Sequence, residues 1–136
     1  MAAKAKVTNY RMGTPRKPEQ GVRFGVMRFL PRGVKKGDYA KRHYFDVWLP
    51  TVAPSRKLLK QYQTSGAAND DEAWKRYTAA YRREMKKTDA HQTILALAEI
   101  AKRTPIAVGC YCDLTKQHCH RVLLEGMIRR AADGEP

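Results

Sequence analysis

The stretch IAVGCYCDLTKQHCHRVLLEGMIRRA, residues 106–131, decides the fold. Its first seven residues, Ile106–Cys112, are mostly β-branched or small, which suits a strand in the centre of a sheet. A short polar loop follows. Residues 118–131 then predict an amphipathic helix that begins at the end of this loop. The residues expected on the buried face of that helix are Val122, Leu123 and Met127.

Two further strands are predicted upstream. Residues 4–12 form one of them, with Val7 pointing inward. Residues 22–29 form the other, because Val22, Phe24 and Val26 alternate with Arg23, Gly25 and Met27, as in a strand with one buried face. Residues 44–49 fit either a helix or a strand.

The middle of the chain is helical in pattern. A short helix is expected from Pro54-Ser55 to Tyr62, and a second helix begins at Asn69-Asp70, where capping side chains precede acidic residues. A third follows over residues 89–103. On the second helix four side chains share one face, and core packing is the favoured role for Trp74, Tyr77, Tyr81 and Met85.

Strands separated by helical segments indicate at least some parallel pairing, because parallel strands need long crossover connections. The predicted class is therefore α/β, with a small mixed or parallel sheet covered by helices. At 136 residues the chain fits a single domain over residues 1–136. We expect residues 1–21 to be a basic and partly flexible N-terminal segment.

The chain shows no apolar run of the roughly 20 residues that a membrane span needs, and its first residues lack the pattern of a secretory signal. It contains three cysteines. An odd number of cysteines without a targeting segment predicts free thiols in a reducing, cytoplasmic setting. No membrane partner is expected, and the sequence identifies no cofactor.

Charge is the most unusual bulk property. Lysine and arginine number 27 against 13 acidic residues, for a net charge of +14. Residues 1–62 hold 15 of the basic residues and only 3 of the acidic ones. This asymmetry favours a polyanionic partner, with nucleic acid or a nucleotide first and an acidic protein second. A generally basic proteome would produce a similar composition.

The segment from Cys110 to Arg121 carries the candidate chemistry, since it holds all three cysteines and two of the four histidines. Alternation along the strand places Cys110 and Cys112 on one face. Cys119 is expected in or near the first turn of the last helix, where the helix dipole and a neighbouring histidine or arginine favour a thiolate. Ligands of open α/β sheets bind beyond the carboxyl ends of the strands, where this loop lies.

An anion site is predicted at the same place. Arg28 and Arg32 flank the end of the second strand, and they approach the loop after Cys112 if that strand runs parallel to the last one. Together with Arg121 and the amides of the last helix they would bind phosphate or carboxylate. Asp113, beside Cys112, belongs to the same candidate site.

The pattern Cys112-Asp113, a short loop and Cys119-His120-Arg121 resembles the signature of the bacterial family catalogued as domain of unknown function 488. The stretches at residues 26–33, 52–55 and 74–85 resemble its YeaO-like branch. The resemblance covers roughly residues 10–128 and implies the fold and the site, but no reaction. The chain departs from that branch at Met27, where an Asp is usual, and at Leu30, where a Trp is usual. It also retains a Cys-His-Arg triplet that the branch often lacks.

Four interpretations of the cluster remain open. In the first, an anion-binding site holds a nucleotide or a nucleic-acid phosphate. In the second, a thiol enzyme uses Cys119 as nucleophile and His118 or His120 as base, with Cys112 able to form a reversible disulfide with Cys119. The third is a soft-metal site, although the spacing is unlike that of ordinary zinc sites. In the fourth, the cysteines are small buried residues without chemistry.

Overall fold

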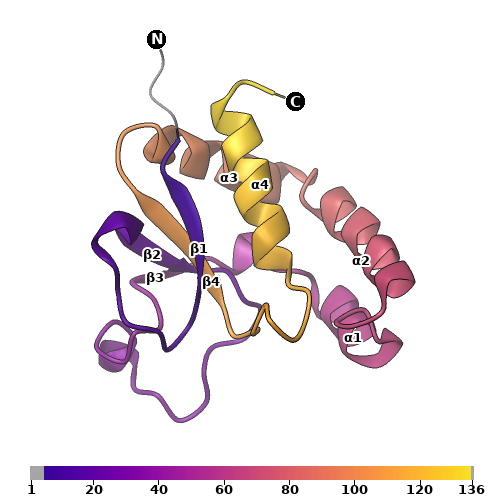
Figure 1. The fold of residues 1–136 in the computed structure, drawn as a ribbon. Helices are drawn as coiled ribbons and strands as arrows, with labels where there is room; N and C mark the ends of the chain where they lie inside the picture. Colours follow the sequence, from indigo (N-terminus) through magenta and orange to yellow (C-terminus); the bar gives the residue numbers. More distant parts are fainter. Residues whose placement is uncertain (1–4, 136) are drawn as a thin grey trace.

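The computed structural model describes residues 5–135. It confirms the α/β class, with a four-stranded sheet in the order β1-β4-β2-β3 and parallel pairing between all neighbours (Figure 1). The strands are β1 (Val7–Arg11), β2 (Val22–Gly25), β3 (Val47–Trp48) and β4 (Ile106–Cys110). Because every strand runs the same way, their carboxyl ends meet at one edge of the sheet, and β4 lies between β1 and β2.

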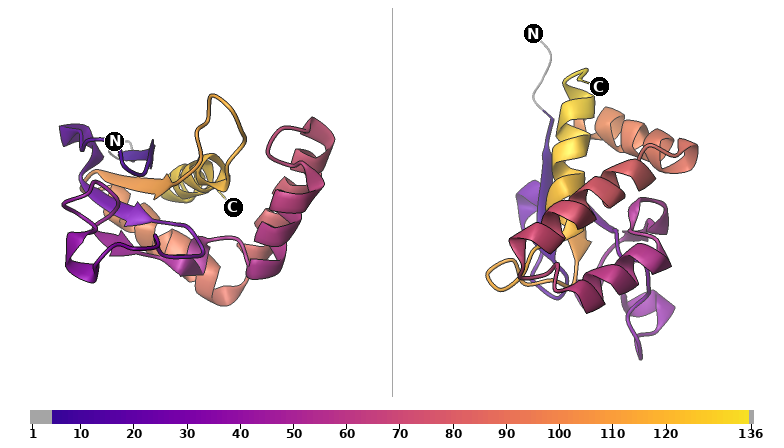
Figure 2. Two further views of the ribbon diagram at one scale, coloured as in Figure 1. Left: turned by 90° about the horizontal axis from the view of Figure 1, so that it is seen from below. Right: turned by 90° about the vertical axis from the view of Figure 1, so that its right-hand side faces the viewer.

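Four α-helices accompany the sheet: α1 (Arg56–Ser65), α2 (Asp71–Glu84), α3 (Thr88–Ala101) and α4 (His120–Ala132). Short 3-10 turns η1 (Pro18–Gln20), η2 (Lys36–Asp38) and η3 (Pro50–Val52) lie in the connections. Ser55 and Asp70 cap α1 and α2 through their side chains, as the sequence predicts. Figures 1 and 2 show α4 lying along β1 and β4, whereas α1 and α2 lie farther from the sheet.

One face of the sheet packs against helices. Val7, Phe24 and Val108 from the strands belong to the same cluster as Leu124 and Ile128 of α4, and all five side chains are buried. The aromatic face of α2 joins this core through Tyr77, Tyr81 and Met85, so the predicted role of that stripe is confirmed. Trp74 is only partly buried at its edge.

Loops cover the other face. Tyr10, Met27 and Phe45 form a second cluster there, together with the ends of the strands. Arg23 lies beneath these loops with no exposed surface, stacks on the Tyr10 ring at 4.1 Å and donates to the carbonyl oxygens of Thr14, Pro15 and His43. Its Nε and Nη2 also donate to Gln20. The buried guanidinium is therefore fully partnered.

Three details of the predicted elements are wrong. The second strand ends at Gly25, and within it Val22 is 40% exposed whereas Arg23 is buried, because loops cover the face that the alternation assigned to solvent. The last strand ends at Cys110. In α4 the buried apolar residues are Leu124 and Ile128, whereas Val122 is 44% exposed and Leu123 and Met127 are partly buried.

Within residues 44–49 the structure forms a strand rather than a helix, and this strand is limited to Val47–Trp48 of β3. None of the helices within residues 5–135 combines the length and the apolar content that a bilayer crossing requires. Residues 1–4 of the predicted flexible segment lie outside the described residues. Its remainder contributes β1 to the sheet, and the flexibility of the segment stays a prediction.

Gly109 shows how tightly β4 is packed on the loop side. A Cβ atom at this position would overlap with Cζ of the Tyr10 ring. The Tyr10 ring cannot easily move, because Arg23 stacks on it and its hydroxyl donates to the Tyr44 carbonyl. We expect Gly109→Ala to lower the free energy of unfolding by about 2–3 kcal/mol, measured by urea denaturation. Gly37→Ala, where the space is open, is the control and should change it by less than about 0.5 kcal/mol. Equal effects of the two substitutions would contradict this packing.

Candidate functional site

The three cysteines come together at the carboxyl edge of the sheet. Cys110 is the last residue of β4, Cys112 lies two residues beyond it, and Cys119 is the N-cap residue of α4. Cys112 is the hydrogen-bond acceptor for both of the other thiols. Cys110 and Cys119 are buried, at 7% and 2% exposure, whereas Cys112 is half-buried. The strand–loop–helix motif of the sequence therefore builds a cluster with one sulfur near solvent.

His120 lies directly behind the thiols. Its Nε2 is 2.7 Å from the carbonyl oxygen of Val26, and its Nδ1 is 3.8 Å from Sγ of Cys119. A carbonyl can only accept, so Nε2 carries the proton and Nδ1, which faces the Cys119 sulfur, is unprotonated. Burial lowers the pKa of His120 from 6.5 to about 4, so the ring is neutral at pH 7.

Hydrogen bonds within the cluster favour a thiolate at Cys112. Those from Cys110 and Cys119 lower the pKa of Cys112 from 9.0 to about 2. The hydrogen bond to Cys112 raises the pKa of Cys110 to about 11, and hydrogen bonds to Cys110 and then to Cys112 raise that of Cys119 well above its ordinary value. The three groups titrate together, and the first proton to leave is lost from Cys112, the most accessible sulfur.

Tyr62 of α1 completes the cluster. Its hydroxyl oxygen is 3.8 Å from Sγ of Cys112, donates to the backbone carbonyl of His118 and accepts from Gln117. Burial raises the pKa of Tyr62, so its hydroxyl keeps its proton at neutral pH. Nothing in the sequence pattern singles out this residue, because it lies 50 positions before Cys112 and approaches it only through the packing of α1.

Arg121 supports the loop between β4 and α4. It is 3% exposed, and its guanidinium donates to the side chain of Asn9 on β1 and to the carbonyl oxygen of Cys112. Both contacts hold the backbone at Cys112 against the sheet. Asn9 is the second residue that sequence reasoning missed, since its role depends on the pairing of β1 with β4.

The strand orientation on which the predicted anion site depended is the observed one, since β2 is parallel to β4. Arg28 follows β2, and its positive charge and that of Arg121 both act on His120. However, Arg28 uses its guanidinium to donate to the carbonyl oxygens of Ala53 and Pro54. Arg32 is exposed in the next turn. Contact of Arg28 and Arg32 with an anion therefore stays a prediction.

Two predicted site residues point away from the thiols. The His118 ring stacks on Trp74 at 4.8 Å, and its Nε2 is 3.4 Å from Asp71. Asp113 accepts from the backbone N–H and the hydroxyl of Thr115 and lies 3.5 Å from Arg11. Each side chain therefore has a partner in the loop, and the loop is fixed on both sides of the cluster.

Within the described residues one set of side chains has the spacing for a metal ion. The donor atoms of Cys110, Cys119 and His120 lie within 4.8 Å of one another, and all three residues are buried. Thiolate and imidazole donors suit a soft cation such as zinc. The carbonyl of Val26 accepts from His120 Nε2 and orients the ring, as backbone carbonyls commonly orient histidines that bind metals through the other nitrogen.

Comparison with known proteins identifies the family. The family model DUF488-N3a, described as the Active DUF488-N3 subclade, matches residues 7–132. The chain belongs to the DUF488-N3a family. The match confirms the resemblance to domain of unknown function 488 and spans the whole thiol cluster of this DUF488-N3a chain. Neither the curated proteins nor the solved structures yielded a match.

The neutral state of His120 leads to a prediction for acid stability. Above pH 6.5 the ring is uncharged in both the folded and the unfolded chain, and its contribution to stability is complete. As the pH falls from 6.5 towards 4, only the unfolded chain binds the proton, so roughly 3 kcal/mol of stability is lost. Urea denaturation at pH 6.5, 5.5 and 4.5 measures this loss. His120→Gln retains an N–H group and removes the titration, so its stability should depend less on pH over this interval; identical dependence in both proteins would contradict the assignment.

Proposed function

We propose that the protein is a thiol-dependent enzyme that acts on a nucleotide or nucleic-acid substrate, with Cys112 as its nucleophile. The observation that carries the proposal is the position of Cys112: the half-buried sulfur of a three-thiol cluster, at the carboxyl edge of a parallel sheet. The family description, Active DUF488-N3 subclade, is consistent with a catalytic role.

The surrounding groups favour Cys112 over Cys119. Cys119 is almost completely buried and its thiol is held in the protonated form, so it acts as a hydrogen-bond donor. Cys110 is a second such donor. The neutral His120 ring packs against Cys119, with Nδ1 3.8 Å from its sulfur. In this arrangement Cys110 and Cys119 stabilise the thiolate, and His120 is a positioning residue.

The reaction that fits these groups is a nucleophilic displacement. The Cys112 thiolate donates an electron pair to an electrophilic atom of the substrate, and a sulfur–substrate bond forms. The bond to the leaving group breaks, and the leaving group departs with its electron pair and takes a proton from water. A second water then cleaves the sulfur–substrate bond: its hydroxyl group joins the substrate, its proton goes to solvent, and Cys112 leaves as the thiolate.

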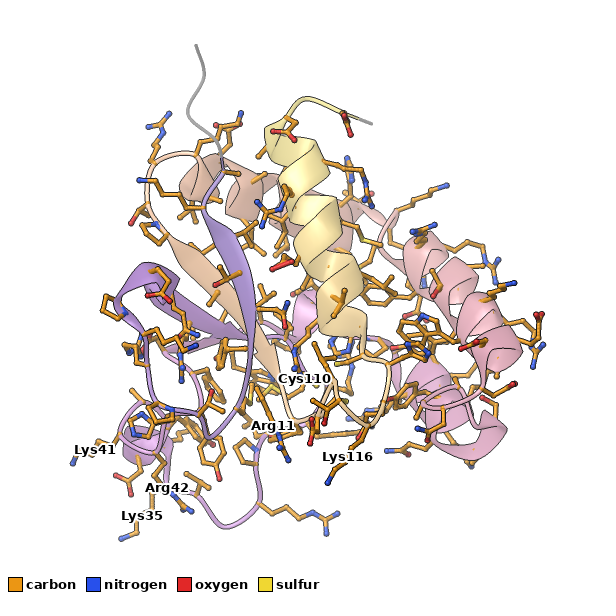
Figure 3. All side chains as sticks on the ribbon, viewed as in Figure 1. Arg11, Lys35, Lys41, Arg42, Cys110 and Lys116 are labelled. Atoms are coloured by element: carbon orange, nitrogen blue, oxygen red, sulfur yellow. The ribbon has the colours of Figure 1, made fainter. Side chains whose placement is uncertain are left out.

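The substrate class is inferred from the charge around the cluster. Figure 3 shows Arg11, Lys35, Lys41, Arg42 and Lys116 at the side of the molecule where Cys110 ends its strand. All five side chains are exposed. Of these five, only Arg11 has an acidic partner among the described residues. We refer to these five residues as the basic rim. Positive charge at this side of the molecule attracts phosphate groups.

Alkylation mapping tests the proposal. Limiting iodoacetamide is added at neutral pH to metal-analysed protein, and the modified cysteine is identified by peptide mass spectrometry. We expect modification at Cys112, its loss in Cys112→Ser and its retention in Cys119→Ser at a reduced rate. DNA, RNA or a nucleotide mixture should protect Cys112. Modification of all three cysteines at equal rates, or one equivalent of bound zinc that prevents alkylation, would overturn the proposal.

A further inference from the structure

A cavity lies away from the thiols, between the end of α2, the first half of α3 and the end of α4. Its volume is about 510 Å³. Pockets of this size hold small organic ligands in other proteins. Met127 of α4 faces this cavity, seven residues after His120, which corresponds to about 10 Å along the helix. The cavity is therefore distinct from the thiol cluster.

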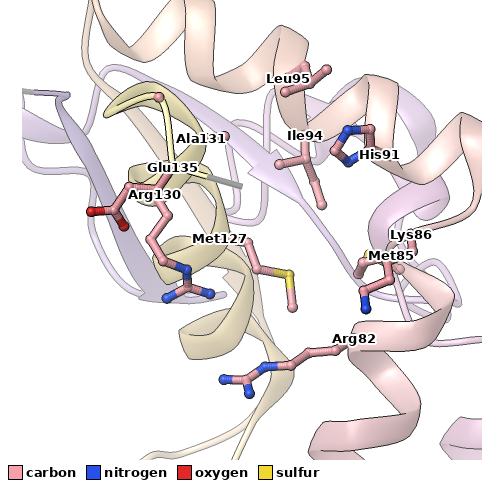
Figure 4. A pocket seen from close by; sticks show the side chains of 11 residues that line it. Arg82, Met85, Lys86, His91, Ile94, Leu95, Met127, Arg130, Ala131 and Glu135 are labelled. Carbon is pink, nitrogen blue, oxygen red and sulfur yellow. The ribbon is translucent and has the colours of Figure 1, made fainter.

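The floor of the cavity is apolar and adaptable. Its apolar side chains come from all three helices: Met85, Ile94, Leu95, Met127 and Ala131. Met85 and Ile94 are buried in the main core, so their part of the lining is rigid. Met127 is only partly buried, so its side chain is free to adjust to a ligand. In Figure 4, Ile94 and Met127 extend into the cavity from opposite helices.

The mouth of the cavity is cationic. Arg82, Lys86 and Arg130 line it, and Figure 4 shows the charged ends of these three side chains arranged around Met127. Among the described residues none of these side chains has a hydrogen-bond or ion-pair partner. Glu135 is the single acidic residue of the lining. The helix dipoles favour cations in the last turns of α2 and α4, but they do not explain why three cationic side chains meet at one apolar cavity.

We infer that this cavity binds a small amphipathic anion, with its apolar body on the methionine and isoleucine side chains and a carboxylate or phosphate group between the arginines. Arginine matches the planar geometry of both groups. The inference uses none of the residues of the thiol site and goes beyond the proposed function.

Anilinonaphthalene sulfonate is a suitable probe, because it joins an apolar body to one anionic group. We expect saturable binding with a stoichiometry of one, monitored by fluorescence. In NMR spectra the methyl signals of Met85 and Met127 should shift, whereas those of Met12 and Met27, which lie in the loop-side core, should not. Uncharged phenylnaphthylamine should bind at least tenfold more weakly.

The double variant Arg82→Gln/Arg130→Gln keeps polar side chains of similar length and should weaken binding of the sulfonate by tenfold or more. Arg76→Gln/Arg103→Gln, at exposed positions outside the cavity, is the matched control and should bind as the wild type does. The rate of Cys112 alkylation reports on correct folding in each variant. Equal binding of the charged and uncharged probes, equal loss in both double variants, or shifts at Met12 and Met27 would overturn the inference.

Discussion

Iodoacetamide should alkylate Cys112 at nearly the same rate at pH 5 and at pH 8. The hydrogen bonds from Cys110 and Cys119 lower the pKa of Cys112 to about 2, so its thiolate is fully formed throughout this interval. An ordinary cysteine with a pKa of 9.0 loses about a thousandfold of its thiolate over the same interval, and its rate falls in proportion. The pH dependence of the rate, measured by mass spectrometry, therefore separates the two cases.

Cys119→Ser and Cys110→Ala provide the controls for this experiment. Serine at position 119 retains a hydroxyl donor, so the rate should remain largely independent of pH. Alanine at position 110 removes a donor, so the pKa of Cys112 should rise and the rate at pH 5 should fall. A wild-type rate that declines tenfold for each pH unit would contradict the shared thiolate, and with it the proposed role of Cys112.

Charge reversal at the basic rim should weaken binding to duplex DNA strongly. In the triple variant Lys35→Glu/Lys41→Glu/Lys116→Glu the slope of log affinity against log salt concentration should decrease by about three, because each phosphate contact contributes about 0.9 to the slope. At low salt we expect an affinity loss on the order of a hundredfold or more, measured by fluorescence anisotropy with one labelled duplex and one labelled RNA.

The matched control is Lys6→Glu/Lys102→Glu/Arg103→Glu, which alters the net charge equally but lies before β1 and beyond the end of α3. If both variants lose the same affinity, binding depends on total charge alone, and the basic rim has no special role. If neither variant binds less tightly than wild type, nucleic acid is not the substrate class, and free nucleotides become the next class to test in the protection experiment.

Much of the fold could be predicted from local patterns. Ser55 and Asp70 begin helices because their side chains satisfy free amides in the first turn, and this signal lies within four residues of sequence. The buried strand at Ile106 was equally clear. The burial of Arg23 was not, because it depends on loops that return over the sheet from residues 14 and 43. Alternation predicts which residues share a face, but not what covers that face.

The candidate site, like the fold, could be predicted only in part from the sequence. The proximity of Cys110, Cys112 and Cys119 follows from a strand, a loop and a helix start that are contiguous in sequence. Their ranking as nucleophiles does not, because it depends on how deeply each sulfur is buried and on which neighbour donates to it. Tyr62 and Asn9 were also beyond prediction, since each reaches the cluster through the packing of a separate element.

The way in which Arg23 holds the loop layer has a consequence for how freely this surface can diverge between relatives. Apart from Gln20, its partners are main-chain oxygens, at Thr14, Pro15 and His43, and every residue type provides such an oxygen. The identity of the side chains in these loops is therefore largely uncoupled from the anchoring of the backbone. Substitutions there can alter the chemistry of the surface while the scaffold beneath it stays unchanged, so the surface can evolve without a matching loss of stability.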